Sequence, residues 1–323
     1  MGLLVEGQWK DQWYDTDSND GQFVREDAGF RDWVSADPES RFAAEAGRYH
    51  LYASLACPWA HRTLILRKLK GLEKIIDVSV VDPYMGEWGW SFSDAPGTIA
   101  DPLYGLEHLF ELYQKAAAGY TGRVTTPTLW DRHHETIVSN ESADIVRMFN
   151  HAFDELAAHP ERDYYPEAMR DEIDAINARV YDAVNNGVYK TGFATTQAAY
   201  EAPFEALFAE LDWLDARLAD NRYLLGDRIT EADWRLFVTL VRFDAVYVGH
   251  FKCNLRRIAD YPNLAGYLRE LYQVPGIAET TNFDHIKQHY YRSHGTINPT
   301  GIVPAGPALD LDAPHGRDAV ASR

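Results

Sequence analysis

The sequence predicts two domains, an α/β domain followed by an all-helical one. Three observations lead to this prediction. A strand pattern, a helix pattern and a second strand pattern follow one another between residues 48 and 81. Two strand-like segments flank a polar turn at residues 126–138. Beyond about residue 167 the apolar residues recur only at the three- and four-residue spacing of helices.

The first 45 residues show no periodicity and are expected to be an irregular arm. They nevertheless carry five large aromatic residues among Asp, Gly and Ser: Trp9, Trp13, Tyr14, Phe30 and Trp33. A disordered arm rarely holds so many aromatic side chains. We therefore expect residues 1–45 to pack on the folded body.

The α/β domain is predicted over residues 46–150 and begins with a β-α-β unit. Residues 48–56 alternate like a strand, residues 58–70 have helical spacing, and residues 75–81 form an apolar second strand. Pro58 suits the first turn of the helix, and Gly71 suits its end. A loop rich in Gly, Trp and Pro follows, over residues 82–104.

The rest of this domain completes a thioredoxin-like order, β-α-β-α-β-β-α. A helix is predicted from about residue 106 to Gly119, and a hairpin has its strands at residues 126–130 and 136–138. Residues 139–142 offer capping groups for a further helix.

A Pro-containing linker over residues 151–166 leads to the helical domain, predicted over residues 167–290. Thr230 and Asp233 have the spacing of a capping box at the start of one of its helices. Residues 291–323 are rich in Pro, Gly and Asp and are predicted to form a C-terminal arm.

Charge and composition exclude several classes of partner. The chain has 323 residues with 49 acidic against 31 basic ones, a net charge of −18. This negative field opposes binding to nucleic acid or to an anionic membrane. No apolar run approaches 18 residues, and two cysteines do not make a disulfide framework. We expect a cytoplasmic protein.

Cys57 is the residue most indicative of chemistry. It precedes a predicted helix, where free backbone N–H groups and the helix dipole stabilise a thiolate. In the run Cys57-Pro58-Trp59-Ala60, alanine stands where a dithiol oxidoreductase has its second cysteine. A mixed disulfide at Cys57 must then be cleared by an external thiol.

Other residues support a thiol-binding site. Pro127 comes directly before a predicted strand, where thioredoxin-like folds have a cis proline that leaves a backbone group free for a peptide-like thiol. Glu141 and Ser142 stand at a helix start that could receive a carboxylate, although plain capping explains each equally well. His285 and His289 are an i, i+4 pair without a third ligand, so no metal is expected.

Several motifs together resemble the glutathionyl-hydroquinone reductases, the xi class of the glutathione transferases. The similarity runs from about Phe30 to the C-terminus. The matching segments are residues 49–71, 123–127, 139–142, 185–190, 241–253, 282–286 and 297–301. Thr126 departs from the family pattern, in which valine is expected before the proline.

The resemblance implies a role for each matching position. Cys57 corresponds to the catalytic nucleophile. The implied glutathione-binding residues are Trp90, Arg123, Val124 through its backbone, Pro127, Glu141 and Ser142, with Trp88 as a rival to Trp90. The implied hydroquinone-binding residues are Tyr189, Tyr247 and Tyr290, with Tyr291 as a rival to Tyr290. A homodimer is also implied.

The resemblance further implies a reaction in which glutathione is a cosubstrate. Cys57 would remove glutathione from a glutathionyl-hydroquinone, and a second thiol would release oxidised glutathione. An omega-like thioltransferase or dehydroascorbate reductase remains an alternative, and a non-catalytic binding protein on the same fold is a remote one. The sequence leaves the physiological quinone, the true thiol and the role of Cys253 undetermined.

Overall fold

The computed structural model describes residues 2–320, which form two compact units. The first unit takes the chain up to Trp13, then Glu26–Asp163 and Thr280–Val303. The second takes Tyr14–Arg25, Tyr164–Glu279 and the chain from Pro304 onward. Each is described by itself below.

The first unit is built on a four-stranded sheet with the order β4-β3-β6-β7. The strands are β3 (Tyr49–Ala53), β4 (Ile76–Val80), β6 (Thr128–Asp131) and β7 (Thr136–Ser139). Strand β3 pairs in parallel with β4 and antiparallel with β6, and all five of its residues are buried. The β-α-β unit and the hairpin predicted from the sequence are therefore the two halves of one sheet.

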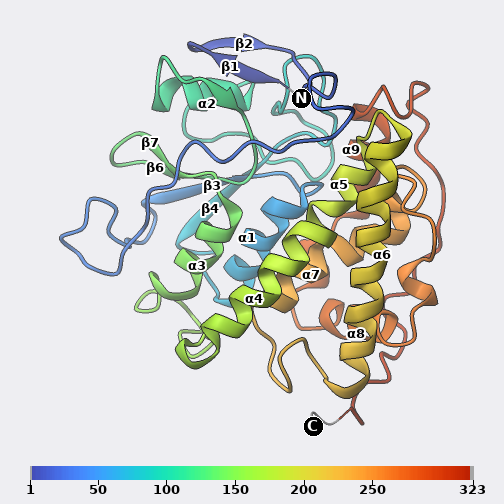
Figure 1. Ribbon diagram of the computed structural model, residues 1–323. Coiled ribbons are helices and arrows are strands. Elements are labelled where there is room, and N and C mark those ends of the chain that lie inside the picture. Colours follow the sequence, from blue (N-terminus) through green and yellow to red (C-terminus); the bar gives the residue numbers. More distant parts are fainter. Residues whose placement is uncertain (1, 321–323) are drawn as a thin grey trace. The chain divides into compact units, whose positions relative to one another are not determined.

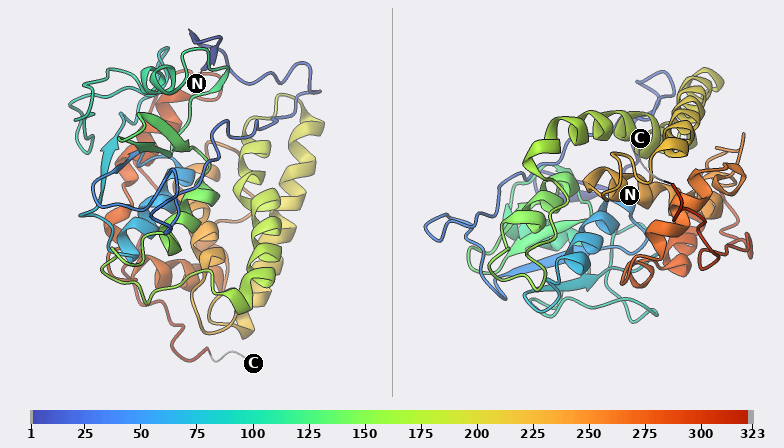
Figure 2. Two further views of the ribbon diagram at one scale, coloured as in Figure 1. Left: turned by 90° about the vertical axis from the view of Figure 1, so that its left-hand side faces the viewer. Right: turned by 90° about the horizontal axis from the view of Figure 1, so that it is seen from below.

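Helices cover both faces of this sheet (Figures 1 and 2). Helices α1 (Pro58–Leu69) and α3 (Ser142–His151) lie together on one face, and α2 (Leu109–Ala116) lies on the other. The α2 side is filled by large aromatic and aliphatic side chains, among them Tyr52, Tyr113 and Trp130. This arrangement confirms the predicted thioredoxin-like order.

The prediction that the first 45 residues are irregular is wrong at its beginning. Strands β1 (Leu3–Val5) and β2 (Gln8–Lys10) form a hairpin, and β1 also pairs with the short strand β5 (Gly122–Arg123). The two connecting residues, Glu6 and Gly7, have φ values of 47° and 75°. Positive φ at both positions is the geometry of a type I′ turn, for which Asn-Gly is the usual signal. Three-residue strands around Glu-Gly are too short for periodicity to reveal them.

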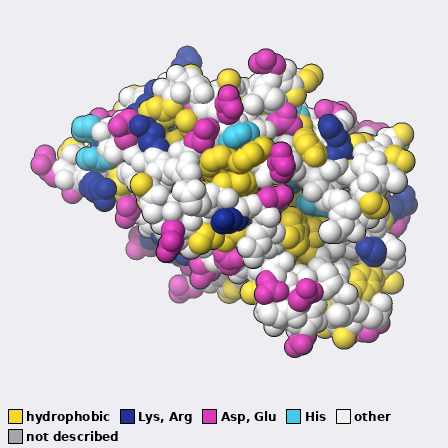
Figure 3. All heavy atoms as spheres, turned by 90° about the horizontal axis from the view of Figure 1, so that it is seen from above, with side chains coloured by type: hydrophobic (Ala, Val, Ile, Leu, Met, Phe, Trp, Pro, Cys, Tyr) yellow, Lys and Arg dark blue, Asp and Glu magenta, His cyan; other side chains and the backbone are white. Residues whose placement is uncertain are grey.

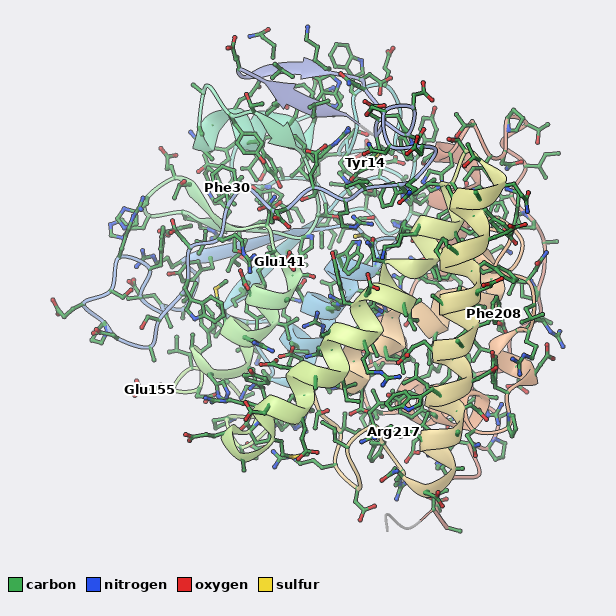
Figure 4. The ribbon with its side chains drawn as sticks, viewed as in Figure 1. Tyr14, Phe30, Glu141, Glu155, Phe208 and Arg217 are labelled. Carbon is green, nitrogen blue, oxygen red and sulfur yellow. The ribbon has the colours of Figure 1, made fainter. Side chains whose placement is uncertain are left out.

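The arm segment that follows Glu26 packs on the first unit, as expected from its aromatic content. Phe30, labelled in Figure 4, lies 5.2 Å from the ring of Tyr120 and 5.8 Å from that of Tyr113. The backbone N–H of Asp32 donates to the carbonyl of Val138 at 2.9 Å. The arm is thus held by ring packing and by hydrogen bonds along β7.

The second unit is helical, as predicted. Its helices are α4 (Arg170–Val180), α5 (Gly187–Gly192), α6 (Gln197–Asp220), α7 (Glu231–Arg242) and α8 (Leu264–Tyr272). Two π-helical segments, η2 (Tyr181–Asn185) and η3 (Phe243–Tyr247), continue α4 and α7, and η1 (Glu167–Met169) and η4 (Ile258–Asp260) are short 3₁₀ turns. Helices α5 and α6 run side by side (Figure 1). Thr230 and Asp233 form the predicted capping box of α7.

The last helix, α9 (Phe283–Ser293), belongs to the first unit. It follows the 3₁₀ turn η5 (Ala278–Thr280). Periodicity alone assigned most of α9 to a helical domain ending at residue 290. Periodicity shows that a segment is helical, but not which hydrophobic core receives its apolar face.

The surface carries the negative charge that the composition predicts. Asp and Glu side chains are spread over the face seen in Figure 3. Between residues 2 and 320, no helix is both long and apolar enough to cross a membrane.

Candidate active site

Cys57 lies where β3 gives way to α1, at the N-cap of that helix. Its side chain makes no capping hydrogen bond to a backbone N–H of the helix. The thiol donates to the carbonyl oxygen of Thr126 at 3.4 Å and the residue is 9% exposed. The backbone N–H groups of the first helical turn lack helical acceptors, so the sulfur lies beside a helix terminus with free donors.

The Thr126–Pro127 peptide bond is cis, as the sequence predicted. This bond lies between β5 and β6, and its carbonyl is the group that faces the sulfur of Cys57. Two features predicted from separate parts of the chain therefore meet at one point.

No second cysteine is available at this point. Ala60 is fully buried one turn into α1, and the only other cysteine, Cys253, is a free thiol in the second unit. Burial raises the pKa of the Cys253 thiol, which suits a packing residue and not a nucleophile. Residues 2–320 contain no cluster of His, Cys, Asp and Glu that could hold a metal ion.

The start of α3 gathers polar groups near the same end of the sheet. Glu141, labelled in Figure 4, is the N-cap residue, and its carboxylate accepts from the backbone N–H of Ala143 at 2.8 Å. The hydroxyl of Ser142 is buried and accepts from the guanidinium of Arg62 at 3.4 Å. Arg62 comes from α1, is 1% exposed and packs over the ring of Trp59 at 4.6 Å. A buried cation and a helix N-terminus together favour an anionic ligand.

A buried network fixes the backbone that leads into Pro127. The hydroxyl of Tyr113 donates to the carbonyl of Thr125 at 3.0 Å. The amide of Asn140 donates to the hydroxyls of Tyr113 and Thr125, each at 3.2 Å. Val124, buried at 3% exposure, belongs to the adjacent apolar cluster. The backbone at Thr125, next to Val124, is therefore held by Tyr113 of α2 and by Asn140, two residues before α3.

Trp90 and Trp88 differ sharply in burial. Trp90 is 4% exposed and stacks on His289 with ring centroids 4.8 Å apart. Trp88 is 50% exposed and stacks on the ring of His108. Within the described residues, the indole N–H of Trp90 has no protein acceptor. Trp90 is thus held in place by packing, whereas Trp88 lies on the surface.

Arg123 is engaged by the N-terminal arm. Its guanidinium donates to the backbone carbonyls of Gln12 and Trp13 and lies 3.3 Å from the carboxylate of Glu26. The side chain is 8% exposed. Arg123 therefore ties the arm to the edge of the site, next to Val124.

Tyr290 and Tyr291 differ in solvent exposure. Tyr290 is 1% exposed on α9, and its ring meets those of His289 and His294 at 5.3 and 5.5 Å. Tyr291 is only partly buried, and desolvation raises the pKa of its hydroxyl. Tyr290 is therefore the more buried of the two.

The other two predicted tyrosines come together in the second unit. Tyr189 of α5 and Tyr247, at the end of η3, have ring centroids 6.2 Å apart, and both rings contact Phe251. Arg25, from the arm segment of this unit, lies 5.0 Å above the ring of Tyr189 and donates to the side chain of Asn186 at 3.0 Å. Tyr189 and Tyr247 follow or end π-helical segments, a geometry frequent at functional sites.

Comparison with known proteins identifies the family. Models of the glutathione S-transferase N-terminal and C-terminal domains match residues 56–152 and 197–270. The glutathionyl-hydroquinone reductase YqjG of Escherichia coli is 58% identical over 98% of this chain and 99% of its own. The glutathionyl-hydroquinone reductase PcpF of Sphingobium chlorophenolicum is 56% identical over 96% of this chain and 98% of its own. The chain belongs to the glutathionyl-hydroquinone reductases.

Solved structures place this reductase family among the xi-class glutathione transferases. A xi-class enzyme from Natrialba magadii superposes with a TM-score of 0.93 at 50% identity, covering 100% of this chain and 98% of its own. A glutathione-bound structure of YqjG superposes with a TM-score of 0.90 at 56% identity, covering 98% and 99%. An omega-like glutathione S-transferase from Schizosaccharomyces pombe is less similar than the two reductases, at 51% identity over 92% of this chain and 97% of its own. The family and the fold predicted from the motifs are confirmed.

Three residues that shape the candidate site were not identified from the sequence as part of it. Arg62 and Tyr113 were given no role and Asn140 only a capping one, although Arg62 bonds Ser142 and the other two hold Thr125, two residues before Pro127. The only signal available for Arg62 was a charged residue on the apolar face of a predicted helix. Tyr113 and Asn140 look like ordinary core and capping residues until the sheet brings them together.

Proposed function

We propose that this chain uses glutathione to convert glutathionyl-hydroquinones to hydroquinones through a Cys57–glutathione mixed disulfide. The observation that carries the proposal is the position of the Cys57 sulfur, at a helix N-terminus and facing the carbonyl before cis-Pro127. The family membership supports the substrate class, because both bacterial relatives are named for this reaction.

The first half-reaction is a nucleophilic substitution at the glutathionyl sulfur of the conjugate. The thiolate of Cys57 attacks the glutathionyl sulfur of the conjugate, the Cys57–glutathione disulfide forms, and the bond from that sulfur to the aromatic carbon breaks. A carbanion is a poor leaving group, so the conjugate reacts as its keto tautomer, in which that carbon has already taken up a proton. The electron pair of the broken bond then passes through the ring to the carbonyl oxygen, which is protonated to the hydroquinone hydroxyl.

The tyrosines suit this first step. A neutral phenol can donate to the oxygen of the quinol ring and relay a proton. We assign this to Tyr189, Tyr247 and Tyr290, the three tyrosines with the highest burial among those predicted. Tyr291, which is only partly buried, is not included.

The second half-reaction restores the enzyme. The thiolate of another glutathione attacks the mixed disulfide, which releases oxidised glutathione and leaves the Cys57 thiolate. The proton of the incoming thiol balances the one taken up by the carbonyl oxygen. We assign the glutathione-binding role to Trp90, Arg123, the backbone of Val124, Pro127, Glu141 and Ser142. The glutathione-bound structure of YqjG supports this choice of thiol.

The decisive experiment compares wild type with Cys57→Ala. Wild type should release hydroquinone from a glutathionyl-hydroquinone when glutathione is added, and mass spectrometry should find one glutathione on Cys57. Cys57→Ala should do neither. Hydroquinone release by the variant would refute the nucleophile. An adduct from oxidised glutathione without hydroquinone release would favour an omega-like disulfide reductase, and absence of both would leave a binding protein.

We further propose a cytoplasmic homodimer. Two free cysteines suit a reducing compartment, and the family resemblance implies the dimer. Light scattering on the purified chain tests the assembly, and a mass near one 36.7 kDa chain would contradict it.

A further inference from the structure

Helix α9 presents three side chains to one loop of the first unit. His285, His289 and Ser293 are four residues apart, so they lie on one face of the helix. His285 Nε2 lies 2.7 Å from the carbonyl oxygen of Pro96, and His289 Nδ1 lies 2.9 Å from that of Pro83. A carbonyl only accepts, so each of these ring nitrogens donates.

The third bond runs in the opposite sense. The backbone N–H of Met85 donates to Ser293 Oγ at 2.9 Å. All three bonds end on the backbone of residues 83–96, a loop without a helix or an extended strand of its own. They therefore fix the path of the chain, independently of the loop's side chains.

The loop approaches α9 closely at its far end. A Cβ on Gly97, which has a φ of 86°, would lie 2.7 Å from His285 Nε2. Both the backbone conformation and the space exclude a larger residue here. The loop is therefore fitted to this helix along its length.

Trp90 lies between the two ends of this contact. Its ring stacks on that of His289 at 4.8 Å and an interplanar angle of 23°. Since His289 also holds Pro83, one buried imidazole fixes both the loop and the ring of Trp90. Tyr290 is the next residue of the same helix.

We propose that His289 is a positioning residue for glutathione, acting through Trp90. The inference rests on the proposed function, in which Trp90 binds glutathione and Tyr290 binds the hydroquinone. Helix α9 then carries one subsite directly and sets the other through the loop.

The test measures how Cys57 glutathionylation depends on the concentration of oxidised glutathione. His289→Phe keeps an aromatic ring beside Trp90 but removes the donor to Pro83. It should raise the half-saturating concentration about fivefold, the effect of losing one ordinary hydrogen bond. His289→Asn keeps a donor near the Nδ1 position and should recover part of this loss. Alkylation of Cys57 by iodoacetamide, which does not use the loop, should be unchanged.

A matched control and a double-mutant cycle distinguish positioning of Trp90 by His289 from a general contribution of His289 to stability. His50→Phe removes another buried imidazole of the same unit, which bonds Ser79, and should lower the melting temperature without changing half-saturation. In a Trp90→Phe background the effect of His289→Phe should largely disappear. An equal effect in both backgrounds, or wild-type half-saturation in the His289 variants, would overturn the proposal.

The measurement remains informative if a variant misfolds or the proposed function fails. Ser293→Ala removes the acceptor for Met85, and the 3.4 Å contact of Ser293 Oγ with His289 Nδ1, at a partly buried position; it too should raise the half-saturating concentration. Glutathionylation by oxidised glutathione needs no quinol. If wild type leaves glutathionyl-hydroquinone unchanged while the His289 effect persists, the substrate assignment is wrong and the positioning role stands.

Discussion

The sulfur of Cys57 and the carbonyl oxygen of Thr126 lie 3.4 Å apart, although the two residues are 69 positions apart in the sequence. The sheet produces this contact by placing β3 beside β6 in antiparallel register, with Tyr52 opposite Thr128. The ends of both strands then meet at the N-terminus of α1. In the proposed reaction, this carbonyl region is where the backbone of glutathione would pair.

The side chain of Thr126 gives the first prediction. Its hydroxyl is buried without a hydrogen-bond partner, and an unsatisfied buried hydroxyl costs about 1–3 kcal/mol. Thr126→Val has nearly the same shape and keeps the backbone carbonyl. It should raise the free energy of unfolding by about 1 kcal/mol, measured in urea, and leave glutathionylation of Cys57 unchanged. A destabilised variant would show that the hydroxyl is hydrogen-bonded, for instance to an internal water.

The second prediction concerns Arg62, whose guanidinium donates to the hydroxyl of Ser142. Arg62→Met removes the positive charge next to the site proposed for a carboxylate of glutathione. It should raise the glutathione concentration needed for half-saturation about tenfold. Iodoacetamide should still alkylate Cys57. Arg67→Met is the matched control, because Arg67 lies on the same helix but donates to the carbonyl of Ile76 at 2.6 Å. We expect it to lower stability only. Equal loss of affinity in both variants would show a general defect of α1.

The fold was predictable where elements are long and periodic. Helix α1 was predicted over residues 58–70 and spans Pro58–Leu69, because Pro58 and Gly71 mark its ends locally. The β1–β2 hairpin escaped because its order comes from pairing with β5 and from burial of Leu4, which no local pattern encodes. The membership of α9 in the first unit is likewise a tertiary fact.

The candidate site was predictable through residues whose chemistry is rare in a given context. A lone cysteine before a helix and a proline before a strand are such residues, and the sulfur of Cys57 indeed contacts the carbonyl of the residue before Pro127. The contacts of Arg62 and His289 could not be predicted from the sequence, for the same physical reason. Each acts on a neighbour brought close only by packing, Ser142 in one case and Trp90 in the other.

The third prediction follows from a buried histidine. Burial first, and the guanidinium of Arg132 second, lower the pKa of His50 from 6.5 to about 4. Below pH 6.5 the unfolded chain takes up a proton that the folded chain refuses. The contribution of neutral His50 to the free energy of unfolding is therefore complete above pH 6.5 and is lost as the pH falls toward 4.

Urea unfolding between pH 7.5 and 5 measures this effect. The free energy of unfolding of wild type should decrease across the window by about 1–2 kcal/mol on account of His50. His50→Gln cannot be protonated, so its profile should be flatter by that amount. Parallel profiles for the two proteins would show that His50 titrates normally in the folded state.

The last prediction separates the two adjacent tyrosines of α9. Tyr290 is 1% exposed and lies among His289 and His294, whereas Tyr291 is partly open to solvent. If the Tyr290 hydroxyl stabilises the quinol oxygen, Tyr290→Phe should lower kcat for a glutathionyl-hydroquinone about a hundredfold, the usual effect of removing a proton-transfer group. Reduction of a simple glutathione mixed disulfide has no such oxygen and should keep its rate. Tyr291→Phe, the control on the same helix, should match wild type with both substrates. Equal losses on both substrates would instead mean that Tyr290 supports the thiol site, and a loss confined to Tyr291→Phe would exchange the two assignments.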